Sequence, residues 1–353
     1  MKYQIGKASL IIALALSASM PSFAANEKLV FALDLVRHGD RTASDDLPAA
    51  PHQWAEGEGQ LTALGMQQEY QLGLKLRQRY IMDHPLLSSN YQPNTIYIRS
   101  TDYDRTIMSA QALLFGLYPL GTGPASPKST QPALPSGFQP VPIHTVAASQ
   151  DSALLIDISS KKIADMINRY VYASAEWKAK SAELEVLYPR WSQLTGVHVA
   201  SMHDVLSLSD TVRAYVNHDV ALPSGLSSEE AKKIMAAGDW IYASLLKPKE
   251  VGDVAGKAAL QKIVFYLQQA AEQKSKTRFV LISAHDVTTM GVMSALHAPL
   301  DTVPTYAADL NFSLYESGSG NYYVKVTYND NPVNVPGCRG NVCSLSQLIK
   351  NAV

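Results

Sequence analysis

Two short stretches of the chain are almost wholly apolar and end abruptly in polar residues. Residues 29–36 read L-V-F-A-L-D-L-V, with Asp34 the one polar member, and run into R-H-G-D-R at 37–41. Residues 278–282, R-F-V-L-I, run in the same way into S-A-H-D at 283–286. Continuous apolar runs of this length are typical of strands buried on both faces of a sheet. We therefore expect both stretches to be inner strands of a parallel sheet.

Helical patterns follow both of these strands. In residues 61–80, leucines recur at helical intervals and Thr62 is a suitable N-cap. The second strand is followed by a predicted helix from about residue 287 to 296, and residues 260–267 carry another apolar helical face. Strands that alternate with helices predict an α/β fold with helices on both faces of the sheet.

A third strand and helix lie between these pairs. Residues 95–98 form a short apolar run that leads through R-S-T-D-Y-D-R-T into a helix with apolar positions at i, i+3 and i+7. Thr101 or Asp102 is the predicted cap of this helix, which places Arg105 in its first turn. Arginine opposes the helix dipole there, so an anion bound near the helix N-terminus would explain its presence.

The rest of the chain adds two features to this body. Residues 310–315 and 322–328 alternate apolar and polar positions around S-G-S-G, which predicts a β-hairpin added antiparallel to the sheet edge. Residues 119–249 begin with a long Pro- and Gly-rich connection, and the polar helices predicted from about residue 154 to 247 have a low motif content. We predict an α/β body with a mostly parallel central sheet, formed by residues 25–118 and 250–353, and a smaller inserted helical subdomain at 119–249.

The first residues have the layout of a secretory signal peptide. Lys2 and Lys7 precede an apolar run, and S-F-A at 22–24 supplies the small residues of a cleavage site. A membrane anchor is the competing reading, but the run is far shorter than the ~20 residues that span a bilayer. Cleavage after Ala24 leaves 353 − 24 = 329 residues and predicts a periplasmic or secreted protein.

The net charge and the length of the apolar runs exclude two classes of partner, nucleic acid and membrane. The formal net charge is −1, so no basic excess points to nucleic acid, and no later apolar run is long enough to anchor the mature chain in a membrane. Any anion must therefore be bound by local charge. A monomer and a homodimer both remain open.

The polar clusters supply the parts of a phosphoryl-transfer site. Ligands of open α/β sheets bind beyond the carboxyl ends of the strands, and the guanidinium groups of Arg37, Arg41 and Arg105 match phosphate oxygens. His38 between the first two arginines suits a nucleophile, because a neutral ring nitrogen can attack phosphorus. Nearby cations should lower its pKa and so preserve the neutral form.

The second cluster supplies a proton donor. Asp286 suits a general acid, because a carboxyl group beside a phosphate dianion should have a raised pKa and can protonate the departing alkoxide. His285 is predicted to hydrogen-bond a phosphate oxygen.

Asp40 is either ion-paired with one of the pocket arginines or a simple turn residue. Gly39 is expected to allow a sharp turn or a close approach to the ligand.

The two cysteines, Cys338 and Cys343, lie in P-G-C-R-G-N-V-C. Export to an oxidising compartment favours a disulfide between them. A two-cysteine metal site is the alternative, although no histidine lies nearby in the sequence to complete it.

Taken together, the motifs resemble those of the histidine acid phosphatases, the branch of the histidine phosphatase superfamily that contains the prostatic and lysosomal acid phosphatases. The resemblance covers nearly all of the mature chain and is weakest at about 154–254. It rests on R-H-G-D-R at 37–41, G-Q-L-T-A-L-G-M at 59–66, Y-I-R-S-T-D-Y-D-R-T-I-M-S-A at 97–110, V-P-I-H-T-V at 141–146 and S-A-H-D at 283–286.

The resemblance implies a role for each of these site residues. It implies phosphorylation of His38, proton donation by Asp286 and a phosphate pocket made by Arg37, Arg41, Arg105 and His285. It also implies a C-terminal disulfide of Cys338 with Cys343, an acidic optimum, inhibition by tartrate and no metal or other cofactor. Ala43 and Val287 depart from the proline and threonine usual in the family at these places.

We therefore predict a secreted acid phosphatase that hydrolyses small phosphomonoesters through a phosphohistidine intermediate. A phytase or sugar-phosphate phosphatase of the same family is the nearest alternative. A phosphomutase and a non-catalytic phosphate-binding protein are the more distant ones.

Overall fold

The computed structural model describes residues 27–352, and the predicted signal peptide lies outside them. An eight-stranded sheet in the order β3-β2-β4-β1-β5-β6-β7, with β8 paired to β6, forms its centre. The strands are β1 (Lys28–Arg37), β2 (Ile96–Ser100), β3 (Ile143–His144), β4 (Phe279–Ala284), β5 (Asp309–Glu316), β6 (Tyr322–Tyr328), β7 (Asn331–Pro332) and β8 (Val342–Ser344). All three strands expected from apolar runs are present.

The sheet has a parallel and an antiparallel half. Strands β3, β2, β4 and β1 are parallel to their neighbours, whereas β5 pairs antiparallel with β1 and continues into the predicted hairpin with β6. The predicted α/β class is confirmed, and β1 lies at the junction of the two halves.

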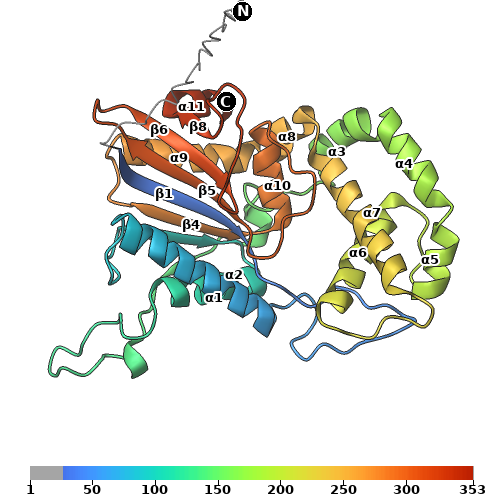
Figure 1. Cartoon of the computed structure of the whole chain (residues 1–353), viewed down its shortest axis with the longest axis horizontal. Helices are drawn as coiled ribbons and strands as arrows, with labels where there is room; N and C mark the ends of the chain where they lie inside the picture. Colours follow the sequence, from blue (N-terminus) through green and yellow to red (C-terminus); the bar gives the residue numbers. More distant parts are fainter. Residues whose placement is uncertain (1–26, 353) are drawn as a thin grey trace, which may run out of the picture.

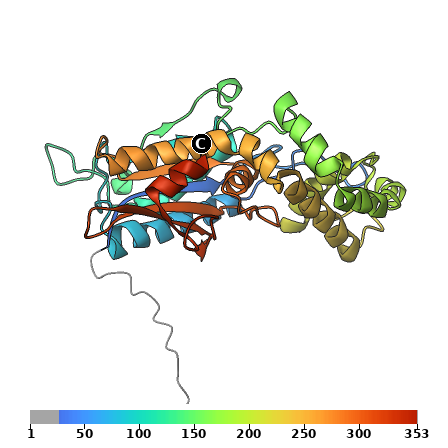
Figure 2. The ribbon, with the colours of Figure 1, turned by 90° about the horizontal axis from the view of Figure 1, so that it is seen from above.

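Helices cover both faces of the sheet (Figures 1 and 2). One face is covered by α1 (Ala63–Arg77) and α2 (Asp104–Leu117), which pack against residues such as Val36 and Ile98. The other face is covered by α9 (Lys257–Ala271), α10 (Asp286–Ala295) and α11 (Leu345–Ala352). The apolar runs of β1 and β4 follow directly from this double cover, since both of their faces are buried.

The helix starts were predicted with mixed success. Thr62 caps α1, because its hydroxyl accepts a hydrogen bond from the backbone N–H of Gly65, and α1 continues into a π-helical turn, η1 (Gln78–Asp83). The cap predicted for α2 was wrong. The N-cap is Tyr103, and no side chain caps the helix. Thr101 instead bonds to His285 and Thr106.

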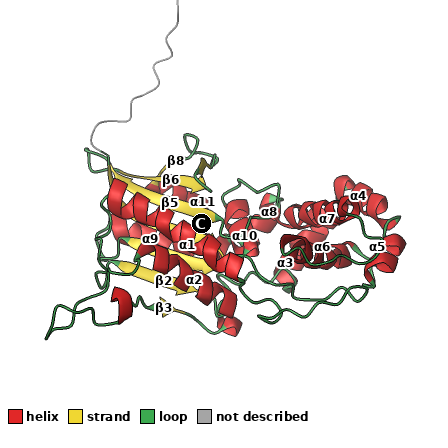
Figure 3. Ribbon diagram, turned by 60° about the horizontal axis from the view of Figure 1, so that its bottom comes forward, coloured by secondary structure: helices red, strands yellow, loops and turns green. Residues whose placement is uncertain are grey.

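A cluster of helices lies beside the sheet and forms what we call the helical lobe (Figures 1 and 3). It consists of α3 (Lys161–Ile167), η4 (Asn168–Tyr172), α4 (Ala175–Glu185), α5 (Tyr188–Thr195), α6 (Met202–Asn217), α7 (Ser228–Leu246) and α8 (Lys249–Ala255). Its apolar core includes the fully buried Trp191 and Tyr215.

Two segments do not follow the division of the chain into body and inserted subdomain. Ala43, Leu47 and Trp54, which follow β1 in sequence, share the core of the lobe. Conversely, β3 lies within the stretch 119–249 but pairs with β2 of the sheet; short 3₁₀ turns, η2 (Pro135–Gly137) and η3 (Ala148–Gln150), flank it. The division of the chain at residues 118 and 249 stays a prediction.

Asp34, the polar member of β1, belongs to a buried acidic cluster under α1. Its Oδ1 accepts hydrogen bonds from Asn311 Nδ2 at 2.8 Å and from the Tyr80 hydroxyl at 3.2 Å. Asp309 lies beside it, with Oδ2 3.4 Å from Nη1 of Arg79. Burial raises the pKa of Asp34 despite the charge of Arg79, and burial together with the charge of Asp34 raises that of Asp309 well above its usual value.

Glu69 of α1 completes this cluster. Its side chain is fully buried, and neither carboxyl oxygen has a hydrogen-bond partner. Burial, and secondarily the charge of Asp309, raises the pKa of Glu69 well above its usual value. The cluster therefore holds protons at a pH where surface carboxyl groups have lost theirs.

The C-terminal segment is closed by the predicted disulfide, which joins Cys338 to Cys343. Within residues 27–352, no helix is long and apolar enough to cross a membrane.

Candidate active site

The two polar clusters of the sequence meet at one edge of the sheet. Arg37 at the end of β1 is in register with Ala284 at the end of β4, and the backbone N–H of His38 donates to the carbonyl oxygen of Ala284 at 3.0 Å. The rings of His38 and His285 are consequently 5.6 Å apart, measured between centroids. The parallel pairing of β1 with β4 is what brings these residues together.

His38 is held with one ring nitrogen free. Its Nδ1 lies 2.8 Å from the carbonyl oxygen of Gly39, which can only accept a hydrogen bond, so Nδ1 carries the proton and Nε2 the lone pair. The side chain is buried, and burial, followed by the charges of Arg37 and Arg105, holds its pKa well below the usual value. The ring is therefore neutral, which is the form that can act as a nucleophile.

Gly39 is needed for a different reason than expected. Its φ does not lie in the left-handed region, but a Cβ there would lie 2.4 Å from the carbonyl oxygen of Gly65 in α1. A close approach is thus made to α1, and the approach to a ligand stays a prediction. It seats residues 38–41, which we call the catalytic loop, on the first turn of α1.

Arg37 and Arg41 each hold a carboxylate. Nη2 of Arg37 is 2.7 Å from Oδ2 of Asp286. Nη2 of Arg41 is 2.9 and 2.8 Å from the two carboxylate oxygens of Asp210 in α6. Burial alone would lower the pKa of Arg41, but the charge of Asp210 outweighs it and the pKa is raised.

Arg105 lies in the first turn of α2, as predicted. Its guanidinium carbon is 4.9 Å from the centroid of the Tyr103 ring. Burial and then the charge of Arg41 lower its pKa, which shows that the guanidinium groups share one region. Arg37 and Arg105 both lower the pKa of His38, and Arg41 in turn lies near Arg105.

Asp286 begins α10 and has its two oxygens in different settings. Oδ1 accepts hydrogen bonds from the Tyr242 hydroxyl at 3.0 Å and the backbone N–H of Val287 at 2.7 Å, while Oδ2 faces Arg37. Burial raises its pKa, but the charge of Arg37 is the largest of the opposing effects, and the net pKa lies below the usual value. The raised pKa was predicted for Asp286 beside a bound phosphate dianion, and for that state it stays a prediction.

His285 is neutral and is bonded through Nε2. The single hydroxyl proton of Thr106 goes to a backbone carbonyl, and that of Thr101 goes to Oγ1 of Thr106. Oγ1 of Thr101, 3.0 Å from Nε2 of His285, therefore accepts the ring proton. Burial, followed by the charge of Arg105, lowers the pKa of His285 to about 4. Its contact with a phosphate oxygen stays a prediction.

Sequence reasoning missed the residues that the helical lobe contributes. Asp210 and Tyr242 lie in a region without motifs, and no sequence signal pointed to them. Tyr306, whose ring centroid is 4.3 Å from the Arg37 guanidinium carbon and 5.9 Å from the His38 ring, precedes the hairpin and was not singled out either.

Neither alternative for Asp40 was right. Its Oδ2 is 2.6 Å from Nε2 of His218 and accepts a hydrogen bond from the Thr62 hydroxyl at 2.7 Å. Asp40 thus joins the catalytic loop to α1 and to the residue that follows α6.

A cleft of about 290 Å³ opens between the sheet edge and the lobe. Arg37, Arg41 and Asp286 line it from the body, and Asp210 and Tyr242 line it from the lobe. In residues 27–352, no group of three or more His, Cys, Asp or Glu side chains is arranged to hold a metal ion.

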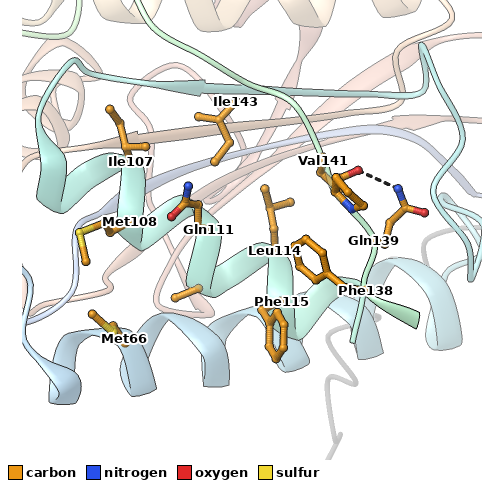
Figure 4. A pocket seen from close by; sticks show the side chains of 12 residues that line it. Met66, Ile107, Met108, Gln111, Leu114, Phe115, Phe138, Gln139, Val141 and Ile143 are labelled. Carbon is orange, nitrogen blue, oxygen red and sulfur yellow. Dashed lines mark hydrogen bonds between the residues drawn. The ribbon is translucent and has the colours of Figure 1, made fainter. Parts of the chain in front are cut away.

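A second hollow lies away from this edge. An apolar groove of about 780 Å³ runs between α2 and the segment 138–143, with Met66 of α1 at its margin (Figure 4). None of the predicted site residues lines it.

Comparison with known proteins gives sequence relatives along almost the whole chain. The chain is 31% identical to the lysosomal acid phosphatase of Xenopus laevis over 358 residues, covering 98% of this chain and 80% of that protein. It is 28% identical to the prostatic acid phosphatase of Bos taurus over 355 residues, covering 97% and 89%.

Solved structures share the fold at lower sequence identity. The phytase of Klebsiella sp. ASR1 superposes with a TM-score of 0.69 at 16% identity, covering 93% of this chain and 95% of that one. The Hafnia alvei phytase in complex with tartrate gives 0.65 at 17% identity, covering 93% and 97%. The model of the histidine phosphatase superfamily, branch 2, matches residues 28–329. The chain therefore belongs to branch 2 of the histidine phosphatase superfamily.

Proposed function

We propose that this protein is an acid phosphatase that hydrolyses phosphomonoesters through a phosphohistidine intermediate on His38. The observation that carries the proposal is the neutral His38 ring with its Nε2 free, near Arg37 and Arg105 and at the same sheet edge as Asp286. The sequence relatives, which are acid phosphatases by name, point to the same reaction class.

The reaction then has two steps. Nε2 of His38 attacks phosphorus, the N–P bond forms as the ester P–O bond breaks, and Asp286 gives its proton to the departing alkoxide. A water molecule next attacks the phosphohistidine and loses its proton to the Asp286 carboxylate, which releases inorganic phosphate and restores His38. Arg37, Arg41 and Arg105 balance the charge on the three equatorial oxygens in both steps.

Bound phosphate must also change the protonation state of Asp286. In the structure Oδ2 is paired with Arg37, and a bound phosphate dianion competes for that guanidinium while adding negative charge beside the carboxyl group. Both effects favour the protonated acid. Binding of the substrate thus favours the protonated form of Asp286, which the proposed general acid needs.

The lobe side of the cleft favours substrates with a single phosphate. Asp210 and Asp239 line it, and the one added cation, Arg213, is paired with Asp239 at 2.6 Å. A second phosphate on the leaving group would face carboxylates. We therefore favour simple phosphomonoesters over phytate, and a sugar-phosphate phosphatase is the remaining alternative.

We also propose export, with residues 1–24 removed as a signal peptide and the mature enzyme in the periplasm or outside the cell. The export signal in the sequence and the disulfide of Cys338 with Cys343 support this location.

Brief incubation with ³²P-labelled substrate and an alkaline quench tests the covalent step. Acid-labile label should appear on His38 and be absent from His38→Ala, whereas His297→Ala, which alters a histidine paired with Asp253 outside the cleft, should label normally. Label on another residue, or turnover by His38→Ala, would refute the mechanism.

The variant Asp286→Asn tests the general acid. It should lose about 10²- to 10⁴-fold in kcat while inorganic phosphate still inhibits, because the arginines remain. Phosphate released in proportion to substrate consumed excludes a phosphomutase, and turnover itself excludes a binding protein.

A further inference from the structure

Tyr242 of the helical lobe reaches across the cleft to Asp286. The tyrosine lies in α7, and its hydroxyl donates to Oδ1 of Asp286 at 3.0 Å. Oδ1 also accepts the backbone N–H of Val287 at 2.7 Å. One carboxyl oxygen is thus occupied by two donors, which leaves it no room for a proton of its own.

We propose that Tyr242 is a positioning residue for the general acid: it assigns the transferable proton to Oδ2 of Asp286 and sets the upper pH limit of turnover. This inference rests on the proposed function. Tyr242 itself does not exchange a proton with substrate, and it acts by fixing the carboxyl group.

The first reason is orientation. A carboxyl group that turns about its χ2 bond presents either oxygen to the leaving group, and only the protonated one is productive. With Oδ1 held between the Tyr242 hydroxyl and the Val287 N–H, the proton must reside on Oδ2. Once phosphate engages Arg37, that oxygen is free to give the proton away.

The second reason is electrostatic. A donor to a carboxylate stabilises the ionised form, so the Tyr242 hydroxyl lowers the pKa of Asp286, although less than Arg37 does. Burial and the charge of Asp286 raise the pKa of Tyr242 well above its usual value, which keeps the phenol protonated as a donor throughout the working range of the enzyme.

Other charged or titratable groups face Asp286 from every element around it and are unchanged when only Tyr242 is altered. They are Arg37 of β1, His38 and Arg41 of the catalytic loop, Arg105 of α2, and His285 at the start of α10. Asp210 of α6 acts on Tyr242 from the lobe. A change of pH profile in a Tyr242 variant therefore reports the loss of one hydroxyl.

The test compares wild type with Tyr242→Phe, using an alkyl phosphate whose poor leaving group makes proton donation limiting. The basic limb of the kcat profile should move to higher pH by about one unit, because the carboxylate loses a stabilising donor. On the acidic plateau kcat should fall about tenfold because the acid is no longer oriented, while KM stays within about twofold.

Tyr215→Phe is the matched control. Tyr215 is a buried tyrosine of α6 whose hydroxyl lies within hydrogen-bond distance of a carboxylate outside the cleft, that of Asp46 at 3.2 Å, and of the carbonyl oxygen of Ala50 at 3.0 Å. Its pH profile should equal that of wild type. A basic limb that does not move in Tyr242→Phe, that moves to lower pH, or that moves equally in the control would overturn the proposal.

A leaving-group series provides a second readout. The loss of kcat/KM in Tyr242→Phe should be greatest for alkyl phosphates and smallest for nitrophenyl phosphate, whose leaving group needs little protonation. A loss of equal size across the series would indicate a merely structural role and refute the inference. If the phenylalanine variant is insoluble, Tyr242→Gln, which keeps a hydrogen-bond donor, can be compared with Tyr242→Leu, which has none.

The two proposals fail in different ways. Turnover by His38→Ala would remove the proposed reaction and this inference with it. An inactive His38→Ala beside a Tyr242→Phe enzyme with the wild-type pH profile would remove this inference alone.

Discussion

Replacing Gly65 by alanine should displace the catalytic loop without unfolding the protein. Gly65 lies in α1, and a Cβ built on it would be 2.2 Å from the carbonyl oxygen of Asp40 and 2.7 Å from its backbone nitrogen. Contacts of a real Cβ essentially never fall below 3.0 Å. Because both clashing atoms are backbone, the loop or the helix has to retreat by about 1 Å to reach ordinary van der Waals separation.

The expected stability loss is moderate and the expected activity loss is large. Overpacking of this kind costs about 1–3 kcal/mol, and alanine in a helix interior returns up to about 1 kcal/mol relative to glycine. The net loss should therefore be about 0–3 kcal/mol in the free energy of unfolding. A 1 Å displacement of His38 and Arg41 relative to Arg105 and Asp286 should lower kcat/KM by about 10²-fold.

Gly73→Ala is the control for this variant. Gly73 lies in the same helix, and its Cβ would be 2.0 Å from the carbonyl oxygen of Leu113 in α2, away from the cleft. Urea unfolding and kcat/KM with an aryl phosphate should show comparable destabilisation in both variants but near-normal activity in Gly73→Ala. If Gly65→Ala retains activity within about threefold, or if Gly73→Ala loses as much, the loop is not positioned by this glycine contact.

Two further predictions concern proton binding and export. The pKa values of Glu69 and Asp309 are raised in the folded state. The folded state therefore keeps protons that the unfolded state releases near pH 4. The stabilisation from these two carboxyl groups is complete below that pH, and it is lost as the pH rises through their folded-state pKa values. Urea unfolding from pH 4 to 8 should show a decline that is shallower in Glu69→Gln, and parallel curves would contradict this. Mass spectrometry of the exported protein should find the chain starting at Ala25; a chain that retains Met1 would exclude cleavage.

The fold was largely predictable because its signals are local. Apolar runs marked β1 and β4, helical spacing marked α1 and α10, and alternation around S-G-S-G marked the hairpin β5–β6. The rule that strand ends converge then placed His38, Arg37 and Asp286 at one edge. Each of these inferences needs only neighbouring residues and one general property of sheets.

The features that could not be predicted from the sequence depend on packing between distant segments. Nothing around Tyr242 or Asp210 distinguishes them from other surface residues of an amphipathic helix, and only the docking of α6 and α7 against the cleft gives them partners. The cap of α2 was missed because Thr101 is bonded to His285, a residue far away in sequence. The ion pair of Asp286 with Arg37 was likewise not foreseen, because it joins residues far apart in the sequence.

The placement of β1 between β4 and β5 has a consequence for biosynthesis. β1 (residues 28–37) leaves the ribosome early, yet both of its partner strands lie within residues 279–316. A nascent chain therefore carries an unpaired, strongly apolar segment until translation is nearly finished, and its folding is delayed by these non-local pairings. Under the export proposed above, late closure of the sheet would keep the chain unfolded until it has crossed the membrane.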